Sequence, residues 1–587
     1  MSKRPKARLR RPDGPRFTRR PNPKAKEGER APSDKHNILQ VIPMGGNEET
    51  GGRNCYLVQY GQEILVIDMG LMFPEDDMPG VDYIIPDLSY LKGKEKMIRG
   101  VIFTHGHLDH IGGAVHLIPK LGNPPVYSSD LTCAMIQKKA EEAVPNHRFR
   151  LHKVKNHDRL RLGIFRLQFF GLSHSIPAAL GVVIETPGGS LVHTGDFKLD
   201  KQAHIHNRTD IEFVKSLAQR NITCLMCDST NAIVPGHQLT EEEVEKNIQQ
   251  MFTQTKGRLI IATMSTLLSR IQQILSMAEK YNRKVHIVGY SMRSNIEIGV
   301  KLGYVRIKPG TIIDWENAKR LPNNRYMILC TGTQGEDNAA LMRIAYRENK
   351  NIHIEKNDLV VFSSSVIPGN ERAVTRLKEG LLREGAEIID SKVLDIHAGG
   401  HAKSEDIHDF IQMVRPKYFM PIEGSYSFLL ENKKIALRAG IPEKNVLIAD
   451  NGQVIEFFQG QGYVTNRRHP INYVFVDGLG IGDINHLVLR DRKQLASDGM
   501  VIVVAQISRS GKPGKIDIIS RGFTHMKEQG RLIHDMATEV KKALGDKSPK
   551  QETNEPYLRE KVRRQLEKFI FHRTQRQPMI LPVIIET

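Results

Sequence analysis

The sequence predicts an α/β protein: a layered α/β sandwich with an inserted parallel α/β domain, followed by a small α+β C-terminal domain. Short apolar runs closed by Gly, Pro, Asn or Asp fill residues 37–230, which is typical of strands that end in turns or loops. From residue 241, continuous apolar runs alternate with helical segments, as expected for parallel strands covered on both faces. The pattern of short apolar runs returns near Ile388, so the parallel domain interrupts the sandwich.

The individual elements follow from these runs. In the sandwich we expect strands at 37–46, 54–61, 63–70, 99–106, 165–174, 181–189, 190–196 and 222–230, and helices at 110–121 and 131–144. In the inserted domain we expect strands at 258–264, 284–290, 326–332 and 358–365, with helices at 269–281 and 338–347. The predicted divisions are a disordered basic tail at 1–36, the sandwich at 37–235 and 388–460, the inserted domain at 236–387, a linker at 461–470 and the C-terminal domain at 471–587.

The composition restricts the class of protein. Of 587 residues, 40% are hydrophobic and 26% are charged, which allows several packed cores and excludes a disordered or collagen-like chain. Because every apolar run is interrupted before about 18 residues, no membrane partner is expected. Five cysteines provide no disulfide framework, and they predict a reducing compartment, hence a cytoplasmic protein.

The positive charge is unevenly distributed. The formal net charge is +19, and residues 1–35 contain 13 basic and 4 acidic residues, a net of +9. This arm lacks the apolar segment of a secretory signal and is rich in proline. Two interpretations remain open, a solubilising tail and an electrostatic arm for a polyanion such as RNA.

The strongest chemical signal is the segment THGHLDH at residues 104–110, directly after the apolar run VIF. A loop that leaves a strand here directs His105 and His107 at one point, and Asp109 and His110 at a second point nearby. Imidazole nitrogens and carboxylate oxygens are the donors that zinc prefers. The segment therefore predicts a site for two divalent metal ions.

Three other polar residues close predicted strands: Asp68, His174 and Asp196. Each alone is an ordinary turn former or cap. Together with the 104–110 segment, in this order, they resemble the successive motifs of the metallo-β-lactamase superfamily. The resemblance implies an αββα fold with one metal held by His105, His107 and His174, a second held by Asp109 and His110, and Asp196 as bridge. It also implies that Asp68 orients the cluster without ligating strongly.

The inserted domain resembles the β-CASP module of nucleases that process nucleic acids. It is flanked by CDST at 227–230 and HAGGH at 397–401, and the segments THGHLDHIGG, HTGDFKLD, TGTQGE, SSSVIPGNE and GIGDINHLVLRDR together resemble the ribonuclease J family. The resemblance implies a ribonuclease with two Zn²⁺ per subunit, which acts on single-stranded RNA as a 5′ to 3′ exonuclease and as an endonuclease. It also implies a preference for 5′-monophosphate ends, a role in RNA decay and rRNA maturation, and a homodimer or homotetramer formed through the C-terminal domain. The ribosome and an RNA helicase are open as further partners.

The same resemblance assigns the remaining site residues. Asp228 is the candidate proton donor to the leaving 3′-oxygen, with His401 as its acid/base partner. Phosphate-binding residues are predicted in two segments, Ser363, Ser364 and Ser365 in the first, and His397, Ala398, Gly399, Gly400 and His401 in the second. The serines and the two glycines are small residues whose hydroxyl and backbone N–H groups can bind phosphate. Without the family context, the serine run is equally well explained as a turn.

The chain departs from the family pattern where a histidine usually completes the second metal site. The corresponding segment here is PIEGS, which places Glu423 at the ligand position. A carboxylate there fits zinc and also the harder ions Mn²⁺ and Mg²⁺; the opposite reading is a weakened second site. Ser265 and Thr266 stand where the family tends to have Ser-Asn, and Cys224 and Cys227 are interpreted as buried thiols.

Two rival functions stay open at this point. The first is another hydrolase of the superfamily, either a β-CASP DNA nuclease or a thioesterase, although a thioesterase needs neither the insertion nor the +19 charge. The second is a non-catalytic RNA-binding paralogue whose second metal site is weakened.

Overall fold

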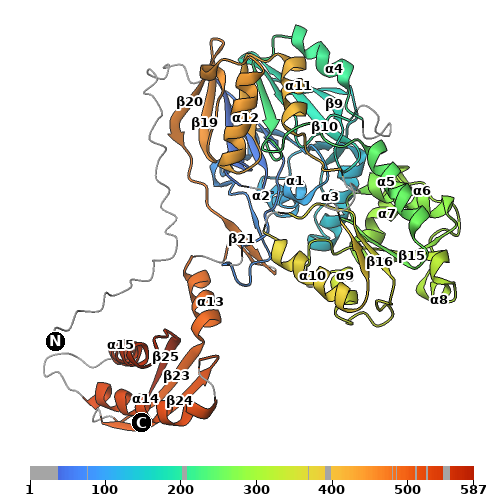
Figure 1. The fold of residues 1–587 in the computed structure, drawn as a ribbon. Coiled ribbons are helices and arrows are strands. Elements are labelled where there is room, and N and C mark those ends of the chain that lie inside the picture. The colour runs from blue at the N-terminus through green and yellow to red at the C-terminus, as the bar shows by residue number, and fades with distance from the viewer. Residues whose placement is uncertain are drawn as a thin grey trace, which may run out of the picture.

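The structure is a computed structural model that describes residues 38–49, 51–75, 77–200, 208–336, 338–367, 369–390, 398–478, 480–483, 486–508, 512–523, 526–545 and 555–587. The basic tail expected at 1–36 and the predicted phosphate-binding residue His397 lie outside these residues. Figure 1 shows a sandwich domain beside an inserted domain, with a smaller C-terminal domain set apart from both.

Two sheets form the sandwich. The eight-stranded sheet has the order β20-β19-β1-β2-β3-β5-β6-β7, and the six-stranded sheet has the order β18-β12-β11-β10-β9-β8. The first contains β1 (Leu39–Gly45), β2 (Cys55–Tyr60), β3 (Glu63–Ile67), β5 (Ile98–Ile102), β6 (Val126–Ser128), β7 (Leu151–Lys153), β19 (Gln453–Phe458) and β20 (Gln461–Arg468). The second contains β8 (Arg159–Leu162), β9 (Phe165–Leu172), β10 (Ala179–Thr186), β11 (Gly189–His193), β12 (Cys224–Asp228) and β18 (Tyr418–Ile422).

Alternating side chains on these strands fill three apolar layers. Val41 and Val58 point into the core between the two sheets, while their neighbours Ile42 and Leu57 pack beneath outer helices. The eight-stranded sheet is covered by α1 (Leu108–Ile111), α2 (Ala114–Lys120) and α3 (Asp130–Ala143), and the six-stranded sheet by α4 (Ile211–Ser216), α11 (Ser404–Val414) and α12 (Tyr426–Arg438). The predicted αββα sandwich is confirmed.

The inserted domain is a five-stranded parallel sheet of order β14-β15-β13-β16-β17. Its strands are β13 (Leu259–Ala262), β14 (Lys284–Val288), β15 (Tyr326–Cys330), β16 (Leu359–Phe362) and β17 (Glu387–Ile389). Its helices are α5 (Glu241–Gln254), α6 (Leu268–Lys280), α7 (Tyr290–Leu302), α8 (Trp315–Ala318), α9 (Ala340–Ala345) and α10 (Glu371–Arg383). On β13, Leu259 and Ile261 pack on one face and Ile260 and Ala262 on the other, which explains the continuous apolar runs.

After the insertion, the chain returns to the sandwich through β18, which pairs in parallel with β12. The segment expected as a linker at 461–470 contains β20, the edge strand of the larger sheet. A small sheet then joins β21 (Val474–Asp477) and β22 (Gly480–Ile481) to β4 (Tyr83–Ile85) of the sandwich.

The C-terminal domain combines a three-stranded sheet with helices on one face. The sheet has the order β24-β23-β25, from β23 (Met500–Ile507), β24 (Pro513–Arg521) and β25 (Met579–Glu586). The helices are α13 (His486–Asp498), α14 (Met526–Gly545) and α15 (Glu555–Thr574), and apolar residues of α14 and α15 form the core with the sheet. Among the helices described here, none combines the length and apolar character needed to cross a bilayer.

Candidate metal centre

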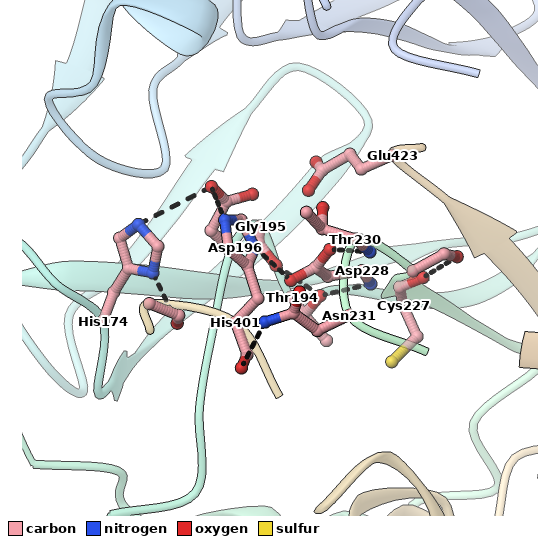
Figure 2. Close-up of polar contacts among 12 residues, drawn as sticks. His174, Thr194, Gly195, Asp196, Cys227, Asp228, Thr230, Asn231, His401 and Glu423 are labelled. Carbon is pink, nitrogen blue, oxygen red and sulfur yellow. Dashed lines mark hydrogen bonds and ion pairs between the residues drawn. The ribbon is translucent and has the colours of Figure 1, made fainter. Parts of the chain in front are cut away.

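The predicted site residues converge where strands of both sheets end. His105 to His110 follow β5, Asp68 follows β3, and His174, Asp196, Asp228 and Glu423 follow or close β9, β11, β12 and β18. Parallel pairing of β12 with β18 sets Asp228 opposite Ile422, so Glu423 lies beside Asp228 although the whole insertion separates them in the chain. Figure 2 shows His174, Asp196, Asp228, His401 and Glu423 directed toward a common space.

Four donor atoms define a nitrogen-rich half of the centre, formed by His105, His107, His174 and Asp196. His107 Nδ1 lies 3.1 Å from His105 Nε2 and 3.0 Å from His174 Nε2. Asp196 Oδ2 lies 3.5 Å from His105 Nε2 and 3.6 Å from His174 Nε2. A tetrahedral zinc ion with bonds of about 2.0–2.1 Å separates its donor atoms by about 3.3 Å. The four atoms therefore fit one zinc-sized ion.

Hydrogen bonds and burial prepare these imidazoles for metal. His174 Nδ1 donates to the Gly400 carbonyl at 2.8 Å, which leaves the Nε2 lone pair facing the centre. Burial lowers the pKa of His107 to about 3, and it also lowers the pKa values of His105 and His174 well below the usual value. All three rings are therefore neutral at pH 7, so a cation binds without displacing protons from them.

Asp109, His110 and Asp196 bring ligand atoms together in a second, carboxylate-rich half, and Glu423 adjoins it through a separate group with His110 and Asp68. His110 Nδ1 donates to Asp68 Oδ2 at 2.8 Å, which directs His110 Nε2 toward Asp196 Oδ1 at 3.2 Å and Asp109 Oδ2 at 3.5 Å. Asp196 thus offers one oxygen to each half, the arrangement of a bridging carboxylate. Asp68 accepts further hydrogen bonds from the Thr104 backbone N–H and hydroxyl, both at 2.9 Å, which fixes the loop that carries the histidines.

The side chain of Glu423 is buried beside this half, while its backbone N–H donates to Tyr56 Oη and its carbonyl accepts from the Ser229 N–H. Within the described residues, neither carboxylate oxygen accepts a hydrogen bond, and one lies in a group of possible ligand atoms with His110 and Asp68. Burial, assisted by the Asp196 carboxylate, raises the pKa of Glu423 well above its usual value. Its backbone adopts a left-handed φ of 59°, as Asp68 does at 60°, a strain that recurs at functional sites. An orphaned, buried carboxylate is satisfied by a cation, so these residues fit a second metal ion.

Asp228 and His401 form a hydrogen-bonded pair beside the centre. His401 Nδ1 lies 2.8 Å from Asp228 Oδ2, and the Thr230 backbone N–H donates to Asp228 Oδ1 at 2.8 Å (Figure 2). Although burial opposes it, the carboxylates of Asp228 and Asp196 raise the pKa of His401 to about 9. The pair therefore holds a proton at neutral pH, with His401 Nε2 at 3.8 Å from Asp196 Oδ2.

The two predicted phosphate-binding segments differ in exposure. Gly400 is packed so tightly that a Cβ would lie 2.4 Å from His174 Cε1, and Ala398 is buried next to Gly399. In the other segment, Ser363 and Ser364 are buried whereas Ser365 is exposed. Ser363 Oγ accepts from Arg270 Nη1 at 3.3 Å, so its hydroxyl is already engaged within the protein.

Two positioning residues are absent from the sequence-based set. Asn54 Nδ2 lies 3.0 Å from His110 Nε2 and 3.5 Å from Asp109 Oδ2, and its backbone N–H donates to the Asp109 carbonyl. Gln238 Nε2 donates to the His401 carbonyl at 3.0 Å. Only the polar character of Asn54 at the start of an apolar strand could have indicated it, and nothing local marks Gln238.

Comparisons with known proteins agree with this geometry. Family models match in three parts: Metallo-beta-lactamase superfamily at residues 49–237, Ribonuclease J, beta-CASP domain at 256–381, and Ribonuclease J C-terminal domain at 487–587. "Ribonuclease J 1" of Streptococcus pyogenes serotype M3 is 34% identical over 94% of this chain and 98% of its own length. "Ribonuclease J 2" of Staphylococcus saprophyticus is 34% identical over 94% of this chain and 99% of its own length.

The chain belongs to the ribonuclease J family. It is a metal-dependent nuclease of the hydrolase class. A solved structure, a protein of unknown function from Enterococcus faecalis V583, covers 71% of this chain and 100% of its own at a TM-score of 0.50. Its sequence identity is 14%, so it supports the fold alone.

Proposed function

We propose that the protein is a two-metal ribonuclease that cleaves single-stranded RNA, as a 5′ to 3′ exonuclease and as an endonuclease, in RNA decay and rRNA maturation. The observation that carries the proposal is the convergence of the nitrogen-rich half, the carboxylate-rich half and the Asp228–His401 pair on Asp196. Relatives that match nearly the whole chain carry the name ribonuclease, which favours RNA over the rival DNA substrate.

We assign the first metal to His105, His107 and His174, the second to Asp109, His110 and Glu423, and the bridging position to Asp196. When bound, two divalent ions supply Lewis acidity and a hydroxide nucleophile for in-line attack on phosphorus. The nitrogen-rich half suits Zn²⁺, and the carboxylates of the second half suit Mn²⁺ or Mg²⁺ as well as Zn²⁺.

Groups of the protein itself transfer the proton and bind the phosphates. Asp228 is the proposed proton donor to the leaving 3′-oxygen, and His401, hydrogen-bonded to it, is its acid/base partner. The backbone N–H groups of Ala398, Gly399 and Gly400 hold the phosphate of the 5′ nucleotide, which gives the preference for a 5′-monophosphate. Ser364 and Ser365 bind a further phosphate of the same strand.

The C-terminal domain is assigned to assembly of a homodimer or homotetramer. On β25, Leu581, Val583 and Ile585 are each about 40% exposed and point away from the helices that cover the other face. An exposed apolar sheet face of this kind favours a contact with a second copy. All five cysteines are free thiols, which supports a cytoplasmic location.

One experiment tests the function directly. Purified enzyme of known metal content is incubated with end-labelled RNA that bears a 5′-monophosphate, triphosphate or hydroxyl, and with a matched DNA. We expect mononucleotides released from the 5′ end, fastest from the monophosphate, and little cleavage of DNA. Equal rates for the three 5′ groups would reject the phosphate pocket. RNA binding without metal-dependent cleavage would favour the non-catalytic paralogue.

A further inference from the structure

A buried charge network connects the metal centre to the inserted domain. Lys198 lies two residues after Asp196, and its Nζ is 2.6 Å from Glu241 Oε1 at the start of α5. The other carboxylate oxygen of Glu241, Oε2, accepts from Arg270 Nη2 of α6 at 3.0 Å. The backbone N–H of Glu241 donates to Asp200 Oδ2 at 2.9 Å. Glu241 is therefore the node that joins the sandwich to the insertion.

These charges are almost completely removed from water. The side chain of Lys198 is 0% exposed and that of Arg270 is 3% exposed, and the two cations are balanced by Glu241 and Asp200. Buried ion pairs contribute little net stability, because desolvation offsets much of the attraction. Such a network contributes more to the relative position of the segments that it joins than to the stability of the fold. The two ends of the network identify these segments.

One end of the network lies in the metal-centre loop, residues 194–198. This loop contains the bridging Asp196, and its backbone is fixed on both sides by the segments that carry other site residues. The N–H of Lys198 donates to the carbonyl of Ser173, which precedes His174, and the N–H of Ala402, which follows His401, donates to the carbonyl of Phe197. These two hydrogen bonds hold the backbone around Asp196 independently of the Lys198 side chain, so the network reaches the metal-centre loop at a segment that is fixed on both sides.

The other end lies in the serine loop, residues 363–367. Arg270 donates from Nη2 to Glu241 and from Nη1 to Ser363 Oγ at 3.3 Å, while its Nε donates to Gln273 Oε1 at 2.8 Å. Gln334 holds the exposed part of the same loop, because its Nε2 donates to the Ser365 carbonyl at 2.8 Å and its Oε1 accepts from the Ile367 N–H at 2.8 Å. The serine loop is thus anchored at Ser363, whereas Ser365 is exposed to solvent.

We propose that Glu241, through Lys198 and Arg270, is a positioning residue that fixes the separation between the metal-centre loop and the serine loop. The scissile phosphodiester and a neighbouring phosphate of the same RNA strand are then engaged together. The inference rests on the proposed function, because it takes the substrate to be a strand with several phosphates. In this arrangement Ser363 anchors the loop and does not itself bind phosphate.

The test compares two substrates that need different parts of the site. A 5′-monophosphorylated oligoribonucleotide requires both loops, whereas bis(4-nitrophenyl) phosphate has a single phosphate and requires the metal centre alone. In Glu241→Gln, we expect kcat for RNA to fall about 10- to 100-fold, as misplaced substrates do. Turnover of the small diester and metal content by mass spectrometry stay within about twofold of the wild type.

Two further variants separate positioning from folding. Arg270→Lys keeps the charge beside Glu241 but cannot reach both Glu241 and Ser363, so it should show the same selective loss on RNA. Asp358→Asn is the matched control, because Asp358 pairs with Arg258 at 3.0 Å in an equally buried pair inside the insertion, at the end of β16 opposite the serine loop. It should lower the melting temperature and leave the ratio of the two kcat values unchanged.

Each other outcome overturns a stated claim. Equal losses on both substrates would place the effect on the metal centre alone, and no loss on either would remove Glu241 from positioning. A selective RNA defect in Asp358→Asn as well would reduce the network to general stability. Wild-type protein that hydrolyses the small diester but no RNA would overturn the proposed function, and the inference with it.

Discussion

The two halves of the metal centre use different donors and respond differently to protons. The nitrogen-rich half consists of three imidazoles and one oxygen, and burial keeps those rings neutral. The carboxylate-rich half contains Asp109, Asp196 and Glu423, of which burial raises the pKa values of Asp109 and Glu423. At neutral pH the imidazoles of the first half carry no proton that a cation must displace. In the second half, a carboxyl group with a raised pKa becomes negatively charged only when a cation displaces its proton. The halves should therefore differ in affinity and in metal preference.

The largest effect is expected from removing a ligand of the nitrogen-rich half. His107 Nδ1 contacts two other donor atoms, so His107→Ala opens the first site directly. Loss of a catalytic metal corresponds to several kcal/mol of transition-state stabilisation, or about 10³-fold or more in kcat on RNA. Rates and metal content are measured together. His152→Ala, which changes an exposed ring stacked on Tyr127, is the control and should keep both. Full activity in His107→Ala would contradict the two-metal assignment.

Glu423 gives the next effect and is the sharpest probe of the second half. In Glu423→Ala we expect the second metal ion to be bound more weakly and kcat to fall about 100-fold, because the other ligands remain. Glu423→His restores the imidazole that the family usually has at this position, and should regain activity with a shift from Mn²⁺ toward Zn²⁺. Unchanged metal content and turnover in Glu423→Ala would remove Glu423 from the site.

The sequence predicts the nitrogen-rich half better than the other, for a physical reason. His105, His107, His174 and Asp196 each follow a strand closely, so local apolar runs locate them at one sheet edge. Glu423 depends on the parallel pairing of β12 with β18 across the whole insertion, and local periodicity does not encode that pairing. The resemblance to the family predicts Glu423 as a ligand. The structure adds that this side chain is buried and that its carboxylate oxygens have no hydrogen-bond partner among the described residues.

The role of residues that act through long-range hydrogen bonds cannot be predicted from the local sequence. Asn54, Gln238 and Glu241 are ordinary polar residues in their local context, and only tertiary contacts give them a role. The sequence predicts a linker at 461–470, where the structure has the edge strand β20, most of whose residues are exposed or half-buried.

Acidification should weaken metal binding in one half of the centre and not in the other. Burial raises the pKa of Asp109 to about 6, so protons compete with the cation below that pH and the affinity of the second half falls as pH falls. The pKa of His107, lowered to about 3, leaves the first half without such competition over the same range. Each displaced proton changes affinity about tenfold per pH unit. Metal content after gel filtration at about pH 7 and about pH 5 should fall from two ions to one, and simultaneous loss of both would contradict the distinction.

The smallest effect is expected at Asn54, whose side chain contacts His110 and Asp109 of the carboxylate-rich half. Its amide lies 3.0 Å from His110 Nε2, and its backbone supports the Asp109 carbonyl. Asn54→Ala removes the side-chain contact and keeps the backbone one, so the affinity for the second metal should fall about tenfold, as for other residues that orient ligands. Isothermal titration with Mn²⁺ measures this directly. Gln59→Ala, on the strand β2 that follows Asn54 and bonded to the Gly61 carbonyl, is the control. Because Asn54 does not contact the nitrogen-rich half, Zn²⁺ at the first site should bind as in the wild type, and weakened binding at both sites would show that the halves are mechanically coupled through Asp196.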